Sequence, residues 1–457
     1  MVHAFKIKNK NIVLDVNSGC VHVVDDLCYE IISKLCENEL LIQETLPDEI
    51  LTSLSTKFSC NDIKEAYKEI YTLYIEDVLF SKDTYENIAI NMKKKSPVKA
   101  MCLHVSHDCN LRCKYCFADE GTYHEERSLM SAEVGMAAMD YLIKNSGKRR
   151  NLEVDFFGGE PLMNFDVVKK IVEYAREQEK IHDKNFRFTI TTNGLLLSDD
   201  KLEYINKNMS NIVLSIDGRK SVNDKVRYRA DGTGSYDTIV PKFQKVAESR
   251  NQDNYYVRGT FTKYNLDFSK DVLHLADLGF KQTSVEPVVC SGVEDYALSK
   301  EDLPKIYNEY ELLVEEYLNR KKNGNGFNFF HFMIDLDQGP CVIKRLSGCG
   351  AGCEYLAIAP NGDIYPCHQF VGTEEYKMGN LNDGNINMNI RQKFENCNVY
   401  TKPKCKDCFA KFYCSGGCMA NACLINGDIN EPHEISCDIQ RKRVECSLYA
   451  KAVEAEF

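Results

Sequence analysis

The chain has 457 residues, of which 44% are hydrophobic and 27% charged, and its formal net charge is −11. These proportions are those of an ordinary soluble protein, and the length allows two to four domains. The acidic balance argues against nucleic-acid binding through bulk charge. No apolar run is long enough to cross a bilayer, and the first residues lack the apolar core of a signal peptide. We therefore expect a cytoplasmic protein with no nucleic-acid or membrane partner.

The N-terminal segment predicts a small module made of a hairpin and three helices. Two β-type runs, at 12–16 and 21–24, flank an Asn-Ser-Gly turn signal. Asp25 can cap a first helix, a second helix follows Pro47, and a third begins near Asn61. This arrangement is winged-helix-like, but the acidic balance disfavours the DNA binding that is common for such modules.

The central segment alternates short apolar runs with helical patterns such as 167–178. This alternation predicts an α/β fold with a parallel sheet. Polar motifs follow several of the runs, and in such folds chemistry collects at the carboxyl ends of the strands. After the last run, Ile306, Tyr310, Leu313 and Tyr317 predict a helix with one buried face. The expected strands cover 103–105, 154–157, 188–191, 212–216, 257–261 and 284–286.

Three cysteines follow the first of these strands in a C-x3-C-x2-C spacing, namely Cys109, Cys113 and Cys116. Three thiolates can hold three irons of a four-iron cluster, which leaves the fourth iron open to another ligand. Zinc is the alternative, because His104, His107 or Asp108 could complete a tetrahedral site. The spacing alone does not distinguish these two metals.

The chain carries 21 cysteines, and 12 of them lie from Cys341 onward. In a long chain without an export signal, this density predicts metal ligands rather than disulfides. The C-x2-C spacing found here is also typical of zinc knuckles. We expect Cys397, Cys423 and Cys446 to be small buried residues instead. The candidate ligands are Cys349, Cys353, Cys367, Cys405, Cys408, Cys414, Cys418 and Cys437.

Several motifs together resemble the radical S-adenosylmethionine (radical SAM) enzymes. They are the three-cysteine motif, Gly158-Gly159-Glu160 after one strand, and Ser215-Ile216-Asp217-Gly218 after another. The cysteine-rich end resembles the SPASM domain, which follows the barrel in many of these enzymes. The resemblance implies a partial (β/α)6 barrel, bound SAM and three [4Fe-4S] clusters, one that binds SAM and two auxiliary. The implied domains are a peptide-recognition module (1–90), the barrel (98–295), a helical bridge (296–345) and the SPASM domain (346–457).

The resemblance also implies roles for single residues. The three-cysteine motif holds the catalytic cluster, and the Gly-Gly-Glu motif receives the methionine amino group of SAM. Tyr115 lies against the adenine. Arg227 is carried over as a carboxylate contact, although Asn223 replaces the histidine of the family's H-D-x-x-R element. The remaining implied contacts, to the ribose and the carboxylate, are Thr192, Asn193, Ser215 and Asp217.

The SPASM resemblance implies one ligand set for each auxiliary cluster. The outer cluster takes Cys405, Cys408, Cys414 and Cys437. The inner cluster takes Cys349, Cys353, Cys367 and Cys418. The spacing between Cys349 and Cys353 is shorter than in some relatives, which leaves open whether one of them, or Cys341, is a ligand. With only three protein ligands, the inner cluster would keep an open iron for a substrate thiolate.

Within the superfamily, the N-terminal module and its Val-His-Val-Val-Asp-Asp sequence resemble the SCIFF ("six cysteines in forty-five residues") maturases. This resemblance implies formation of a thioether between a cysteine sulfur and an α-carbon of a cysteine-rich precursor peptide. The leader of that peptide binds the N-terminal module as an extra strand. The reaction also implies an external one-electron donor such as a flavodoxin or ferredoxin.

Other functions remain open at this point. Sulfatase maturases place an aspartate, their general base, after the cysteine that matches Cys367, whereas this chain has His368, which can still move a proton. Formylglycine formation and carbon–carbon crosslinking are therefore alternatives within the superfamily. A zinc-binding or winged-helix regulator is the alternative outside it. The N-terminal module could also be a cap that only packs, and no role follows for Glu286.

Overall fold

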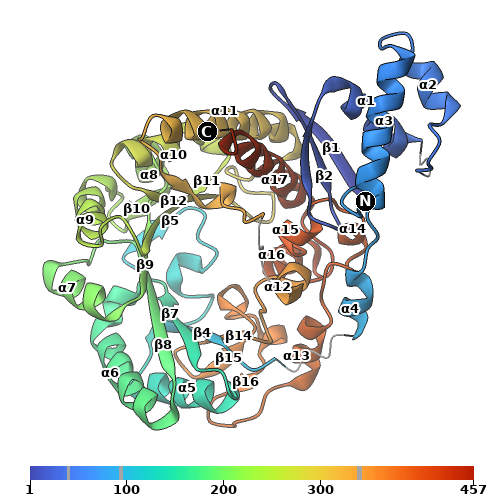
Figure 1. Ribbon diagram of the computed structural model, residues 1–457. Helices are drawn as coiled ribbons and strands as arrows, with labels where there is room; N and C mark the ends of the chain where they lie inside the picture. Colours follow the sequence, from blue (N-terminus) through green and yellow to red (C-terminus); the bar gives the residue numbers. More distant parts are fainter. Residues whose placement is uncertain (39–41, 92–95, 337–341, 457) are drawn as a thin grey trace.

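The computed structural model describes residues 1–38, 42–91, 96–336 and 342–456. A curved sheet forms its centre, helices cover the outer face of this sheet, and a small module lies at one side (Figure 1). No helix within these ranges has both the length and the apolar character that a membrane span requires.

The N-terminal module begins with an antiparallel sheet in the order β1-β2-β3. The predicted hairpin is present as β2 and β3, and Asp25 caps the first helix by accepting a hydrogen bond from the Cys28 N–H. The strand β1 was not predicted, because only Phe5 and Ile7 in it are buried. The elements are β1 (Val2–Ile7), β2 (Lys10–Asp15), β3 (Val21–Val24), α1 (Asp26–Glu37), α2 (Asp48–Leu54), α3 (Cys60–Ile75) and α4 (Tyr85–Asn91).

Several contacts fix the module to the C-terminal region. The ring of His3 on β1 stacks on Phe409, with centroids 3.5 Å apart. Asp83, just before α4, accepts hydrogen bonds from Tyr400 Oη (2.7 Å) and Lys411 Nζ (2.9 Å). The module therefore has a defined position relative to the cysteine-rich end of the chain.

Six parallel strands form the barrel, in the order β4-β7-β8-β9-β11-β12. All six expected strands are present; β9 has the same length as its predicted run but is shifted by one residue, and the other five are longer. They are β4 (Ala100–His107), β7 (Asn151–Gly158), β8 (Asn185–Thr192), β9 (Asn211–Ser215), β11 (Tyr255–Phe261) and β12 (Gln282–Pro287). The outer helices are α5 (Ala132–Asn145), α6 (Phe165–His182), α7 (Asp199–Asn208), α8 (Lys220–Val226), α9 (Tyr236–Ser249) and α10 (Ser269–Asp277).

Side-chain alternation explains how the strands separate a core from a polar interior. In β8, Phe186, Phe188 and Ile190 are fully buried toward the helices. Thr189 and Thr191 alternate with them and are only partly buried, because successive strand residues point to opposite faces. The inner face of the barrel is thus left polar.

The sheet extends beyond the barrel at both edges. β13 (Asn328–Phe329) pairs with β12, and β14 (Tyr355–Ile358) pairs in parallel with β4. β14 lies within the segment expected to be the SPASM domain, so backbone hydrogen bonds join the two segments. The smaller strands are β5 (Leu111–Cys113), β6 (Ser128–Leu129), β10 (Arg227–Arg229), β15 (Asp363–Tyr365) and β16 (Gly379–Asn380).

Two long helices close the structure beside β12. The predicted bridge helix is α11 (Leu303–Lys322), and its four expected core residues are buried. α17 (Glu434–Glu454) packs along it and was not predicted. The other C-terminal helices are α12 (Val342–Ser347), α13 (Met388–Glu395), α14 (Pro403–Lys406), α15 (Lys411–Cys414) and α16 (Met419–Asn426).

Candidate active site

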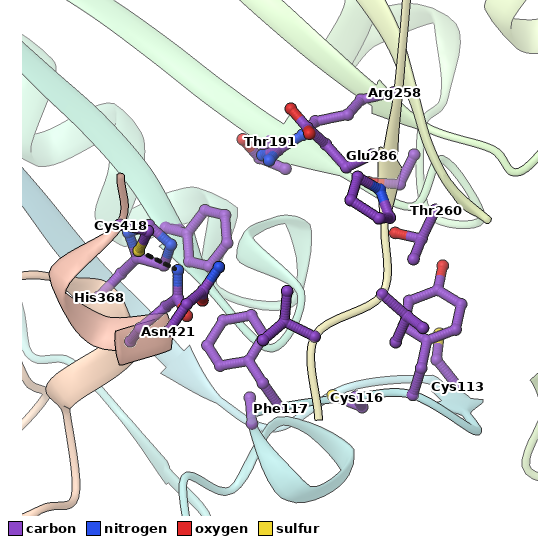
Figure 2. A pocket seen from close by; sticks show the side chains of 18 of the residues that line it. Cys113, Cys116, Phe117, Thr191, Arg258, Thr260, Glu286, His368, Cys418 and Asn421 are labelled. Carbon is purple, nitrogen blue, oxygen red and sulfur yellow. Dashed lines mark hydrogen bonds between the residues drawn. The ribbon is translucent and has the colours of Figure 1, made fainter. Parts of the chain in front are cut away.

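A cavity of about 620 Å³ opens at the carboxyl ends of the barrel strands. One wall carries the three-cysteine motif, the Gly-Gly-Glu motif, Thr192, Asn193 and Ser215. The facing wall comes from the C-terminal region and α17. Figure 2 shows Cys113 and Cys116 on one side and His368 and Cys418 on the other. The fold thus brings both cysteine-rich segments to a single cavity.

Burial of the three-cysteine motif favours neutral thiols, but a nearby positive charge and backbone donors oppose this effect. β5 pairs with β10, which puts Cys113 opposite Arg227. Burial raises the pKa of Cys113 to about 11, and the charge of Arg227 acts in the opposite direction. Burial also raises the pKa of Cys116, whereas three backbone N–H groups that follow it lower it. Charges and donors of this kind stabilise the deprotonated sulfur that a cluster requires.

Two glycines let the loops around Cys109 come into contact. A Cβ on Gly159 would lie 2.2 Å from the Asp108 carbonyl oxygen, and one on Gly121 would lie 2.9 Å from Cys109 Cβ. No side chain fits at either position. The glycines of the Gly-Gly-Glu motif therefore place its backbone directly against the cysteine loop.

Glu160 is fully buried beside this loop. Its carboxylate accepts hydrogen bonds from Thr192 Oγ1 (2.8 Å), the Asn193 N–H (2.8 Å) and the Leu162 N–H (3.0 Å). Burial raises its pKa, and these hydrogen bonds oppose that effect. Thr192 and Asn193 thus hold this carboxylate, and Asn193 Nδ2 also donates to Asn110 Oδ1 at 2.7 Å.

Tyr115, Asp217 and Arg227 form a second polar group. Tyr115 Oη donates to Asp217 Oδ2 at 2.7 Å and accepts from Arg227 Nη1 at 2.9 Å. Asp217 is fully buried, also accepts the Thr260 N–H, and supports the cavity wall from behind. Arg227 Nε is buried without a partner in the described part of the chain.

These features fit the groups that the sequence resemblance implies. The unpartnered Arg227 Nε suits a carboxylate, and the buried Glu160 carboxylate suits an ammonium. The close contacts of Gly159 and Gly121 hold the Gly-Gly-Glu motif beside Cys109. The residues present therefore fit a [4Fe-4S] cluster with SAM beside it.

Four C-terminal thiols gather as expected for the outer cluster. Burial and, to a smaller extent, the neighbouring thiols Cys437, Cys405 and Cys408 together raise the pKa of Cys414 to about 12. The same electrostatic coupling links Cys405 to Cys437 and Cys408. These couplings require the four sulfurs to be close in space.

Three thiols gather at the position expected for the inner cluster. Burial raises the pKa of Cys367, and Cys418 and Cys349 add to this effect. The Cys353 thiol lies 4.0 Å from the Arg391 carbonyl oxygen. Cys341 lies outside the described residues.

The histidines considered as zinc ligands lie behind the cysteine loop. His104 Nδ1 is 3.3 Å from His107 Nε2, and the His104 ring lies against Tyr123. Within the described ranges, no three cysteine, histidine or carboxylate side chains converge on the position of a single metal ion. A cubane cluster does not need such convergence, because each thiolate binds a different iron.

Part of the cavity wall was not predicted. Glu286, at the end of β12, accepts two hydrogen bonds of 3.2 Å from Arg443 on α17. Burial raises the pKa of Glu286, but His331, Arg443 and Arg258 together lower it to about 2. The sequence offered only a strand end for Glu286, and nothing pointed to Arg258 or Arg443. His368 also lines the cavity, and burial lowers its pKa to about 4.

Comparison with protein families identifies two segments of the chain. Residues 103–262 match the model of the radical SAM superfamily. Residues 349–409 match the model of the SPASM iron-sulfur cluster-binding domain. These ranges contain the three-cysteine motif and five of the eight candidate C-terminal ligands, respectively.

Curated relatives and solved structures are similar over most of the chain. The radical SAM cyclopropyl synthase TigE of Paramaledivibacter caminithermalis is 24% identical, over 91% of this chain and 90% of its own. A cysteine-type anaerobic sulfatase-maturating enzyme of Clostridium novyi is 24% identical, over 69% and 86%. Native anSMEcpe with bound AdoMet has a TM-score of 0.65 at 18% identity, covering 79% of this chain and all of its own. Streptococcus suis SuiB bound to precursor peptide SuiA has a TM-score of 0.53 at 17% identity, over 95% and 98%. Both structures share the fold.

Proposed function

We propose that this chain, which belongs to the radical SAM enzymes that carry a SPASM domain, installs a thioether in a ribosomally made, cysteine-rich peptide. The bond joins a cysteine sulfur to a backbone α-carbon of the same peptide. The observation that carries this proposal is the single cavity that reaches both the three-cysteine motif and the C-terminal cysteines Cys414, Cys418 and Cys437.

The arrangement suits an oxidative reaction. When bound, SAM and its cluster supply a hydrogen-abstracting 5′-deoxyadenosyl radical, and two auxiliary [4Fe-4S] clusters supply an exit for one electron. Forming a carbon–sulfur bond from C–H and S–H removes two hydrogens in total. A substrate held in this cavity would lie between the two cysteine-rich walls.

The chain's own residues bind and orient the reacting groups. Glu160 would hold the ammonium of SAM, and Arg227 would hold its carboxylate. Asp217 orients Tyr115 through its hydroxyl, so that the ring forms a fixed wall of the cavity. α17 packs along α11, and its residues Ile439 and Arg443 line the cavity, where Arg443 bonds to Glu286 at the end of β12.

The N-terminal module supplies a peptide-binding edge. In the described part of the chain β3 pairs only with β2, so its other edge is available for an added strand. Val23 on this strand is 49% exposed. SuiB, which has the same fold, was solved with its precursor peptide. These facts support leader binding to β3, while the contacts of His3 and Asp83 hold the module in place.

Carbon–carbon crosslinking is the second candidate, because TigE, a cyclopropyl synthase, aligns with 91% of the chain. Formylglycine formation is supported by the similarity to the sulfatase-maturating enzymes. The residue after Cys367 is His368, and burial lowers its pKa to about 4, so the imidazole is neutral and only a weak base at neutral pH. All three reactions require an external one-electron donor such as a flavodoxin or ferredoxin.

Mass spectrometry of a candidate peptide distinguishes these reactions. The reconstituted protein is incubated anaerobically with SAM, a reductant and a short cysteine-rich peptide encoded beside its gene, and free thiols are then alkylated. Loss of two hydrogens and one alkylatable thiol, stable to disulfide reductants, is the expected result. Loss of two hydrogens with all thiols free would show carbon–carbon bonding instead. A protein that binds zinc and forms no deoxyadenosine would refute the proposed function altogether.

A further inference from the structure

Arg258 presents a positive charge to the interior of the cavity. It lies on β11, its side chain is exposed, and it lines the cavity together with Thr191 and Thr260. Figure 2 shows it beside Glu286, on the barrel wall and away from the cysteine motif. Its charge acts both on Glu286 and on His368, so it lies between the barrel wall and the C-terminal wall.

The nearest carboxylate is already neutralised. Both terminal nitrogens of Arg443 donate to Glu286 Oε2 at 3.2 Å, and Arg443 Nε donates to Tyr310 Oη at 2.8 Å. His331 Nε2 lies 3.3 Å from Glu286 Oε1. Burial lowers the pKa of His331 to about 3, so it is neutral at neutral pH. The charges of Glu286 and Arg443 therefore cancel, and the net charge of this part of the wall is the positive charge of Arg258.

Arg258 differs from the other arginines of the cavity in the partners of its side chain. Arg227 bonds to Tyr115, and Arg443 bonds to Glu286. Among the residues that the structure describes, none forms an ion pair or a side-chain hydrogen bond with Arg258. A guanidinium exposed inside a partly apolar cavity attracts an anion more strongly than one on the open surface.

We propose that Arg258 binds a carboxylate of the substrate peptide and so positions the residue to be modified. This inference rests on the proposed function, and it names a chemical feature of the substrate. The planar guanidinium can donate two parallel hydrogen bonds to a carboxylate. The hydroxyls of Thr191 and Thr260 line the same part of the cavity. The carboxylate comes from an acidic side chain near the modified residue or from the C-terminus of the peptide.

Chemical labelling tests the anion site without relying on turnover. The reconstituted protein with SAM is treated with phenylglyoxal, and modified arginines are mapped by mass spectrometry. Millimolar N-acetyl-aspartate methylamide is expected to protect Arg258, and the neutral asparagine analogue is not. Arg150, which lies on the surface with a side chain 66% exposed, is expected to react equally in all samples. Equal protection by both compounds, or protection by neither, would overturn the proposal.

Kinetics with the peptide test the consequence for the reaction. Arg258→Gln is expected to lower kcat/KM for the peptide about ten- to hundredfold, as for loss of a hydrogen bond to a charged group. Arg258→Lys should recover part of this loss, which excludes misfolding as the cause, and Arg150→Gln is the matched control. An unchanged kcat/KM in Arg258→Gln would overturn the proposal. If the unaltered enzyme forms deoxyadenosine but never modifies the peptide, the proposed function fails instead.

Peptide variants identify the source of the carboxylate. Each acidic residue of the peptide is changed to its amide, and the C-terminus is separately amidated. One of these changes should cause the same loss as Arg258→Gln and add nothing further when combined with it. If the loss of activity caused by every peptide variant adds to the loss caused by Arg258→Gln, the carboxylate contact does not exist.

Discussion

The chemical environment of Cys113 depends on a residue that lies far along the chain. The pairing of β5 with β10 sets it opposite Arg227, whose charge favours the thiolate while burial disfavours it. Glu160 depends on neighbours in the same way, because Thr192 and Asn193 hold its buried carboxylate. At the scale of single residues, the site therefore consists of groups that each need a specific partner to stay charged.

Cys113→Ala is expected to abolish deoxyadenosine formation, because it removes one ligand of the proposed catalytic cluster. Three four-iron clusters hold about 12 irons, so the iron content should fall to about 8 per chain. Iron and sulfide analysis and chromatography of deoxyadenosine check both points. Cys60→Ala, at an exposed cysteine, serves as the control with unchanged iron content. Deoxyadenosine formation at the normal rate in Cys113→Ala would refute the assignment.

α17 is the element that completes the cavity, although it lies at the end of the chain. It packs along α11 and reaches the end of β12 through Arg443. Arg443 is buried, and its guanidinium bonds to both Glu286 and Tyr310. This one side chain thus joins three elements, and its loss leaves a carboxylate in a protein interior without its partner.

Arg443→Met is expected to lower the free energy of unfolding by about 1.5–3 kcal/mol, as for hydrogen bonds to a charged group, because the Glu286 side chain is 29% exposed. Denaturant unfolding followed by far-UV circular dichroism measures this, since the chain has no tryptophan. The double variant Arg443→Met, Glu286→Leu should recover most of the loss. If the double variant is as unstable as the single one, the destabilisation comes from packing and not from the unpaired charge.

The ion pair between Glu286 and Arg443 also makes the free energy of unfolding depend on pH. The pKa of Glu286 is lowered in the folded state from 4.5 to about 2. Its contribution to stability is therefore complete above about pH 4.5 and is lost as the pH falls through 2. Glu286→Gln should remove this part of the acid sensitivity, which an acid titration of the unfolding midpoint measures.

At the scale of the whole molecule, the proposed peptide-binding edge and the candidate active site lie in different places. The N-terminal module contacts the C-terminal region through His3 and Asp83, whereas the cavity lies at the carboxyl ends of the barrel strands. β14 continues the barrel sheet at β4, so the barrel and the cysteine-rich region are joined by backbone hydrogen bonds. A peptide held at β3 would thus be presented to a cavity whose two walls belong to one sheet system.

Deletion of residues 1–90 is expected to weaken peptide binding while peptide-independent cleavage of SAM persists. The reason is that none of the described residues of the module, 1–38 and 42–90, lines the cavity. Fluorescence anisotropy of a labelled peptide measures the affinity, and deoxyadenosine formation reports the intact barrel. An affinity equal to that of the full chain would mean that the module only packs against its neighbours.

The amino-acid sequence alone determined which residues form the local elements and motifs. All six barrel strands, the helix α11 and the three-cysteine motif depend on alternation, helical spacing and short-range spacing, which are visible in any stretch of the chain. Only the tertiary structure decided what meets across the cavity. Arg443 pairs with Glu286, Arg258 is exposed in the cavity, and β14 pairs with β4. Each of these features depends on segments that are distant in sequence. No local pattern encodes such contacts, because they arise from how complete elements pack against one another.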